Sequence, residues 1–351
     1  MSGTAGIPAV HGREDVKGLP LLSGGYSTED AMGVKGSIGP RARLTVRATG
    51  LLAGTVLAAC ATLIAAPAAS AARAASALPA AAASQAAASS PATGPVGVGA
   101  KSAAVENAAT GALLWSRGLN TERPMASITK VMTAYIVTRA GDLGRRITIP
   151  SAVVAYVREH DASNAGLRPG DKLTAAQLLY ALLLPSGADA AYALAQAYGP
   201  GLSAFIAKMN ATARLLGMTR TRFSNFDGLP YPTPYSNFST AANLLVLGRA
   251  AMLLPAFRAI VDQSAYRLAA GSGHHAYRWT NVNPLIGHYQ GAIGIKSGYT
   301  RAAGQCLLFE ATRNGRSVIG VTLHSPGPIS PINSADATRI LNWAFSELEL
   351  A

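Results

Sequence analysis

The stretch that decides the fold class is Gln305–His324, QCLLFEATRNGRSVIGVTLH, near the C-terminal end of the chain. Two runs rich in apolar and β-branched residues, Gln305–Thr312 and Ser317–His324, flank the dipeptide Asn314-Gly315. An Asn-Gly pair between such runs favours a type I′ turn, so this stretch predicts an antiparallel hairpin. Ala292–Lys296 predicts another strand directly before it.

Working outward, the chain has helical patterns in its middle and a second hairpin near the start of the folded part. Thr174 and Gln177 have the spacing of a capping box, which predicts a helix start. Further helices are predicted from near Ser127 to Gly141 and over Asp189–Tyr198, Leu202–Leu216, Ser239–Leu253, Pro255–Gln263 and Ser334–Leu348, and a hairpin over Ala103–Asn107 and Ala112–Ser116. Strands at both ends with helices between them predict an α+β fold, in which helices flank one antiparallel β-sheet and an all-helical lobe is inserted.

Composition limits the class of protein. The chain has 351 residues, of which 49% are hydrophobic and 13% charged. The first hundred residues differ in composition from the rest, so roughly 250 residues remain to fold into one large domain. The formal net charge is +13, but basic residues form no block beyond Arg145-Arg146 and no stripe interleaved with aromatic residues. We therefore expect no nucleic-acid partner.

An uncharged apolar segment, residues 48–66, follows Arg41, Arg43 and Arg47 and ends at Pro67. This is typical of an export signal. Three interpretations stay open: cleavage at Ala69-Ser70-Ala71, an uncleaved membrane tether, or lipoprotein processing at Cys60. Each predicts a domain outside the cytoplasm, secreted to the cell wall or anchored to the outer face of the membrane. The predicted parts are a leader with signal peptide or anchor (1–72), an Ala/Ser/Pro-rich linker (73–96) and a folded domain (97–351).

The chain carries no metal-binding motif. It has two cysteines, Cys60 and Cys306, and no CxxC or HExxH sequence, and its six histidines do not fall at helical metal-ligand spacing. Cys60 lies in the export segment, so the folded domain keeps one thiol and forms no internal disulfide. We expect neither a metal nor an organic cofactor.

Three short motifs carry possible chemistry. In Ser127-Ile128-Thr129-Lys130, the i,i+3 spacing brings the lysine amine near the serine hydroxyl, where a neutral amine could accept its proton. Ser186-Gly187-Ala188 follows a predicted helix and could supply a second hydroxyl for proton transfer. Lys296-Ser297-Gly298 ends a predicted strand, where the two side chains could hold a carboxylate and the glycine lets a substrate backbone lie close. Each motif alone is common.

In this order, the three motifs resemble those of the penicillin-binding serine acyltransferases and β-lactamases. Their surroundings resemble the low-molecular-mass D,D-carboxypeptidases, peptidase family S11. The segments that carry this resemblance are Pro124–Thr133, Leu183–Ala191, Met209-Asn210, Asp227-Gly228-Leu229 and Gly294–Thr300. The resemblance runs from about Val105 to the C-terminus and implies the serine β-lactamase or DD-peptidase fold.

The resemblance also implies a reaction and a set of roles. The substrate would be a peptidoglycan stem peptide ending in D-Ala-D-Ala, and β-lactam antibiotics would acylate the same serine. Ser127 would form the acyl-enzyme, Lys130 would accept its proton and Ser186 would shuttle a proton. Substrate would be bound by Lys296, Ser297, Gly298 and Tyr299, with the N–H groups of Ser127 and Tyr299 forming the oxyanion hole.

The sequence departs from the family pattern at three places. Ala188 replaces the usual asparagine of the second motif, and Ser297 replaces the usual threonine of the third. The stretch Ile329–Ser334 lacks the arginine that often precedes the last helix, although Arg301 could compensate. Two alternatives follow. A non-catalytic peptidoglycan-binding or penicillin-sensing module stays open. A class A β-lactamase is disfavoured because its deacylating glutamate is missing after the second motif, and Glu159 precedes that motif.

Overall fold

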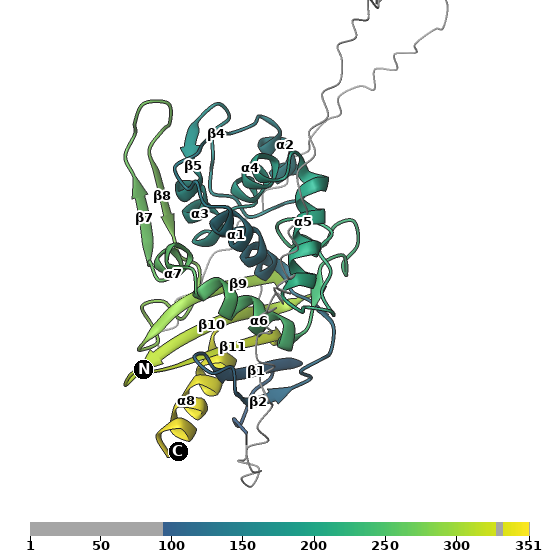
Figure 1. The fold of residues 1–351 in the computed structure, drawn as a ribbon, viewed down its shortest axis with the longest axis vertical. Helices are drawn as coiled ribbons and strands as arrows, with labels where there is room; N and C mark the ends of the chain where they lie inside the picture. The colour runs from purple at the N-terminus through teal and green to yellow at the C-terminus, as the bar shows by residue number, and fades with distance from the viewer. Residues whose placement is uncertain (1–93, 328–332, 351) are drawn as a thin grey trace, which may run out of the picture. The chain divides into compact units, whose positions relative to one another are not determined.

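The computed structural model describes residues 94–327 and 333–350. The predicted leader, the apolar segment 48–66 and nearly all of the predicted linker lie outside the described residues, so those boundaries stay predictions. The described part has the predicted α+β architecture, with a mixed succession of strands and helices (Figure 1).

One five-stranded antiparallel sheet forms the base of the fold, in the order β2-β1-β11-β10-β9. Its strands are β1 (Ser102–Asn107), β2 (Leu113–Arg117), β9 (Ala292–Thr300), β10 (Gly304–Arg313) and β11 (Arg316–Ser325). The predicted turn at Asn314 and Gly315 is confirmed, since both residues have positive φ, 50° and 72°. β9 extends four residues beyond the predicted end at Lys296, so the whole third motif lies within an edge strand.

The helices are a single 3-10 turn, η1 (Ala126–Ile128), and α1 (Thr129–Ala140), α2 (Ala152–Glu159), α3 (Ala175–Leu183), α4 (Ala188–Tyr198), α5 (Leu202–Leu215), α6 (Ala241–Met252), α7 (Pro255–Val261) and α8 (Ala335–Leu350). The ends of the predicted helices agree with the structure to within two residues. Ser127 lies in the 3-10 turn before α1 rather than in the α-helix itself. The sequence patterns did not indicate α2.

Three pairs of short strands accompany these elements: β3 (Arg123–Pro124) with β6 (Phe238–Ser239), β4 (Arg146–Thr148) with β5 (Lys172–Thr174), and β7 (Ala265–Leu268) with β8 (Tyr277–Thr280). The helical lobe was predicted to be all-helical, and the structure corrects this detail, because β4-β5 and the β7-β8 hairpin lie beside its helices (Figure 1). Strands of two to four residues carry too little periodicity to be recognised from sequence.

Helices cover both faces of the sheet. α8 packs on β10 and β11, while α6 packs on β1 and β11 from the opposite side. α6 approaches closely because of Gly248, where an added Cβ would lie 2.8 Å from Cδ1 of Ile319. The two faces therefore have separate hydrophobic clusters, a small one beneath α8 and a larger one that continues into the helical lobe.

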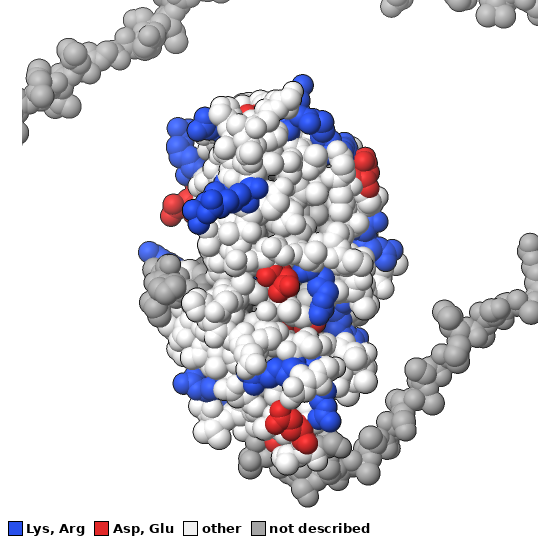
Figure 2. Space-filling model, turned by 90° about the vertical axis from the view of Figure 1, so that its left-hand side faces the viewer, with Lys and Arg blue, Asp and Glu red and all other residues white. Residues whose placement is uncertain are grey.

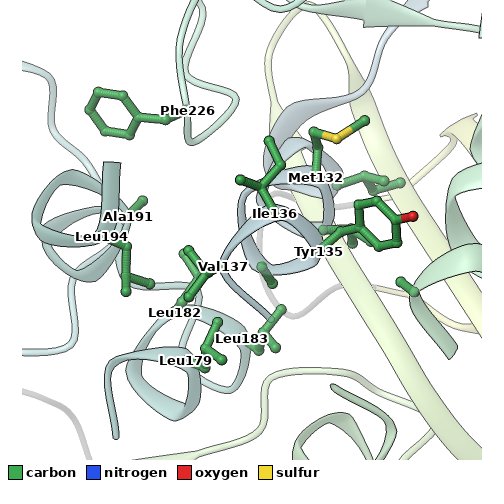
Figure 3. Packing of buried hydrophobic residues seen from close by; sticks show 14 of the residues in the cluster. Met132, Tyr135, Ile136, Val137, Leu179, Leu182, Leu183, Ala191, Leu194 and Phe226 are labelled. Carbon is green, nitrogen blue, oxygen red and sulfur yellow. The ribbon is translucent and has the colours of Figure 1, made fainter. Parts of the chain in front are cut away.

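α1 forms the centre of the lobe. Nine of its twelve residues are buried, and Figure 3 shows its side chain Val137 beside Leu182 of α3. The start of α3 is fixed by the predicted capping box, with the Gln177 N–H donating to Thr174 Oγ1 at 3.2 Å and the Thr174 N–H donating to Gln177 Oε1 at 2.8 Å. The helix that bears Lys130 is thus buried in the core over most of its length.

The surface agrees with the sequence-based expectation of dispersed charge. On the face in Figure 2, lysine and arginine side chains occupy several separate places rather than one continuous field. Among residues 94–327 and 333–350, no single helix has the length and hydropathy to span a membrane; α6 and α7 meet these criteria only as a pair bent by 105°.

Candidate active site

The first motif brings its hydroxyl and amine together. Ser127 lies in η1 and Lys130 in the first turn of α1, and Lys130 Nζ donates to Ser127 Oγ at 3.0 Å. The same amine donates to the main-chain carbonyl of Asp227 at 2.9 Å. Lys130 is only 1% exposed. A buried amine held by the hydroxyl and a neutral carbonyl is suited to accept a proton from the serine.

Burial is the main cause of a lowered pKa at both motif lysines. It lowers the pKa of Lys130, while the carboxylates of Asp227 and Asp189 oppose the shift. Lys296, also 1% exposed, has its pKa lowered to about 7, first by burial and then by the positive charge of Lys130. Because each ammonium disfavours the other, the protonation of the two lysines is coupled.

The third motif lies along the edge strand β9. Lys296 Nζ donates to the carbonyl of Ser297 at 2.9 Å, and Ser297 Oγ donates to the carbonyl of Val282 at 3.4 Å. Gly298 contacts η1, and Tyr299, the next residue, is half-buried. The structure therefore brings the first and third motifs together, as the sequence analysis predicted.

The second motif forms a tight turn between α3 and α4. Ser186 adopts a left-handed conformation, φ 67°, which is uncommon for a residue other than glycine. Its carbonyl accepts from Ser163 Oγ at 2.7 Å, and the Gly187 N–H donates to the Ala181 carbonyl at 3.1 Å. Within the described residues, the Ser186 hydroxyl makes no hydrogen bond to either motif lysine. The predicted role of Ser186 in proton transfer therefore stays a prediction.

Asp189 supports this turn and was missed as a functional residue. Its carboxylate accepts from the N–H groups of Ala165, Leu167 and Ala190 at 2.9–3.0 Å. Burial nevertheless raises the pKa of this carboxyl, against the effect of these hydrogen bonds. The side chain fastens the 163–167 loop to the start of α4. No motif signals this role, because an aspartate in the first turn of a helix is common.

The Asp227 loop is the second feature that sequence reasoning left without a role. Gly228 has φ 90°, and an added Cβ would overlap the carbonyl oxygen of Ala126. The loop is held by Asn225, whose Oδ1 accepts from the Gly228 N–H at 2.8 Å. This close approach brings the Asp227 carbonyl to Lys130. The Asp-Gly dipeptide was the available signal, but it indicates only a turn.

The departures from the family pattern have clear positions. Ala188 is fully buried as the first residue of α4, and its N–H donates to the Ser163 carbonyl at 2.8 Å. Arg301 is exposed in the turn between β9 and β10. Most of Ile329–Ser334, where the arginine is missing, lies outside the described residues.

No group of three or more histidine, cysteine or acidic side chains in the described part of the chain could hold a metal ion. Cys306 is a free, buried cysteine. Burial raises the pKa of its thiol to about 12, so this group is a core residue rather than a nucleophile.

Comparison with known proteins places this geometry in a family. A family model described as D-alanyl-D-alanine carboxypeptidase, peptidase family S11, matches residues 85–327. The chain belongs to this family. A D-alanyl-D-alanine carboxypeptidase of Streptomyces sp. (strain K15) is 41% identical over 252 residues, covering 68% of this chain and 85% of the relative. A second one, from Mycobacterium tuberculosis, is 36% identical over 242 residues, covering 68% and 79%.

Solved structures agree with the family. The crystal structure of the Streptomyces K15 DD-transpeptidase matches with a TM-score of 0.67 and 40% sequence identity, covering 73% of this chain and all of that one. The predicted fold class is confirmed. As a member of family S11, the chain is a serine-type D-Ala-D-Ala carboxypeptidase, and serine acyl-enzymes and inhibition by penicillin are general in this family.

Proposed function

We propose that this chain removes the terminal D-alanine from peptidoglycan stem peptides ending in D-Ala-D-Ala, with Ser127 as its nucleophile. The observation that carries the proposal is the 3.0 Å hydrogen bond between Lys130 Nζ and Ser127 Oγ, made by an amine whose pKa burial lowers. A serine hydroxyl needs such a base to attack a peptide carbonyl.

In the acylation step, Ser127 Oγ bonds to the carbonyl carbon of the penultimate D-alanine while its proton moves to Lys130. The C–N bond to the terminal D-alanine then breaks, and the leaving amine takes a proton that Ser186 passes on from Lys130. The Ser127 and Tyr299 N–H groups stabilise the developing oxyanion. Water next attacks the ester, which releases the shortened peptide as an acid and returns the proton to Ser127.

Lys296 and Ser297 serve in binding. An ammonium and a hydroxyl on the edge strand are suited to hold the carboxylate of the substrate, and the free edge of β9 offers main-chain groups to an extended peptide. β-lactams acylate the same serine. The exposed Arg301 is the candidate for a further contact to the terminal carboxylate.

The reaction takes place outside the cytoplasm, because its substrate is a wall polymer. The apolar segment 48–66 serves in export as a cleaved signal, as an uncleaved membrane tether, or as a lipoprotein signal processed at Cys60. Fractionation of cells into cytoplasm, membrane and medium, with N-terminal sequencing of the mature chain, distinguishes these outcomes.

The decisive experiment measures D-alanine release from a D-Ala-D-Ala peptide by the purified protein, together with mass spectrometry of a labelled penicillin adduct. We expect release of D-alanine and an adduct on Ser127, with both lost in Ser127→Ala. An adduct without release of D-alanine would favour the penicillin-sensing alternative. The absence of both the adduct and the release would overturn the proposal.

A second candidate is transpeptidation, since the matched solved structure is named a DD-transpeptidase. The acyl-enzyme would then react with an amine instead of water. Adding an acceptor amine to the same assay tests this, because a transpeptidase forms the cross-linked product in preference to the free acid.

A further inference from the structure

Asp227 presents its two acceptor groups to different partners. Its main-chain carbonyl accepts from Lys130, while its carboxylate accepts from the Tyr156 hydroxyl at 2.8 Å and from the Leu229 N–H at 3.2 Å. The residue is fully buried. Among the described residues, no ion pair within 4.0 Å joins this carboxylate to Lys130. A buried carboxylate thus lies near a buried amine without pairing with it.

Tyr156 is fixed firmly enough to hold the carboxylate in this orientation. Its ring lies on α2 and contacts those of His160, Tyr192 and Phe226, with centroid separations of 4.7, 5.3 and 5.5 Å. Burial and the neighbouring carboxylate raise the pKa of its hydroxyl, so the phenol stays a donor throughout the working pH range. The other side of the loop is tied to α1, since Thr133 Oγ1 donates to the Phe226 carbonyl at 2.6 Å.

We infer that Tyr156 is a positioning residue, which keeps the Asp227 carboxylate turned away from Lys130 so that the lysine can work as a neutral base. This inference rests on the proposed role of Lys130 as the acceptor of the Ser127 proton. It adds to that role a residue on α2, outside all three motifs.

The charges around Lys130 show why this restraint matters. Lys296 approaches from β9 and disfavours a second ammonium, whereas Asp189 on α4 and Asp227 favour the charged lysine. The Asp189 carboxylate is held by three main-chain N–H groups, but Asp227 depends on one N–H group and the Tyr156 hydroxyl. His160, Tyr192 and Tyr231 are the other ionisable groups facing Tyr156. Asp227 is therefore the carboxylate whose orientation one side chain controls.

Removing the hydroxyl would leave a buried carboxylate short of a hydrogen bond, which is costly. The Lys130 ammonium, which already interacts electrostatically with this carboxylate, is able to compensate. A direct ion pair would stabilise the charged lysine and raise its pKa by about one to three units. The base would then be protonated, and inactive, over more of the acidic range.

The test is the pH dependence of Ser127 acylation by a labelled penicillin, measured on the full chain. In Tyr156→Phe, we expect the acidic limb of the rate profile to move up by about one pH unit or more. This lowers the rate about tenfold on the acidic limb and leaves the alkaline plateau nearly unchanged. Tyr192→Phe is the matched control, because the Tyr192 hydroxyl belongs to the same aromatic cluster but makes no hydrogen bond to Asp227. The rate profile of Tyr192→Phe should follow that of the wild type.

Asp227→Asn gives a second, opposite prediction. It keeps the carbonyl and an acceptor for Tyr156 but removes the negative charge, so the acidic limb should move to lower pH. The Tyr156→Phe/Asp227→Asn double variant should lose the upward shift of Tyr156→Phe. An equal loss of rate at every pH in Tyr156→Phe, or an unmoved limb in Asp227→Asn, overturns the positioning role alone. A wild-type chain that is never acylated overturns the proposed function itself.

Discussion

The backbone of Gly298 lies directly against the backbone nitrogen of Ser127. A Cβ added to Gly298 would come within 2.7 Å of that nitrogen and 3.1 Å of the Ala126 Cβ. The third motif can therefore contact η1 only because it ends in glycine. The nitrogen that carries the N–H group of the proposed oxyanion hole lies at this same close contact.

Gly298→Ala should disable acylation by pushing β9 away from η1. We expect the rate of labelling by penicillin to fall at least tenfold, since loss of one oxyanion donor costs about 10²–10³ in rate. Gly144→Ala is the matched control, because an added Cβ there meets nothing within 4 Å. Wild-type labelling of Gly298→Ala would contradict this account of the gap.

Lys296→Met should stabilise the fold while removing activity. Burial lowers the pKa of Lys296 from 10.5 to about 7. Between these pH values the unfolded chain holds a proton that the folded chain lacks, so the stability of the fold rises with pH across this window. Below pH 7 the fold bears the full free-energy cost of burying Lys296. We expect Lys296→Met to raise the free energy of unfolding at pH 7 by about 2 kcal/mol and to flatten its rise toward pH 10.

Urea unfolding at pH 7 and pH 9, with penicillin labelling in parallel, checks both parts. Lys172→Met is the control, because Lys172 is exposed on β5 and its replacement should change stability by less than about 0.5 kcal/mol. If Lys296→Met were less stable than the wild type at pH 7, the contacts of Lys296 would stabilise the fold by more than the burial of its amine destabilises it.

Ala188→Asn should increase turnover if the missing amide limits the reaction. Ala188 is the buried first residue of α4, at the position where the family normally has an asparagine. We expect D-alanine release to rise a few-fold, expressed per penicillin-titratable site so that unfolded protein does not enter the comparison. Ala188→Leu adds similar bulk without the amide and should not show the gain. An unchanged or lower rate in Ala188→Asn would mean that Ala188 is not limiting.

What the sequence could predict of the site was local. The i,i+3 spacing of Ser127 and Lys130 makes the two side chains neighbours on a helix, so their contact could be predicted locally. The hairpin at Asn314-Gly315 was predictable because turn chemistry and β-rich flanks agree. Bringing the first and third motifs together required the family resemblance, because spacing says nothing about contacts between segments more than a hundred residues apart.

The roles of Asp227 and Tyr156 could not be predicted, because local spacing gives no information on contacts between distant segments. The carbonyl that receives Lys130 belongs to Asp227, 97 residues later in the chain. Tyr156 lies on an eight-residue helix, which is shorter than the window over which helical periodicity is recognised in a sequence. The contacts of both depend on how the lobe packs, which no local pattern records.

Asp189→Asn should loosen the Ser186 turn, because an amide cannot accept all the main-chain hydrogen bonds that the two carboxylate oxygens of Asp189 accept. Ala165 and Leu167 donate to one oxygen of Asp189, and Ala165 and Ala190 to the other, so a side-chain NH₂ must face at least two backbone N–H groups whichever way it turns. We expect a loss of about 1–3 kcal/mol in the free energy of unfolding and slower D-alanine release, with the Lys130–Ser127 contact intact. Asp262→Asn, on the C-terminal end of α7 and exposed, should alter neither quantity. Urea unfolding and release assays on the two variants decide the matter: an Asp189→Asn protein as stable and as active as the wild type would mean that the 163–167 loop holds the turn without this carboxylate.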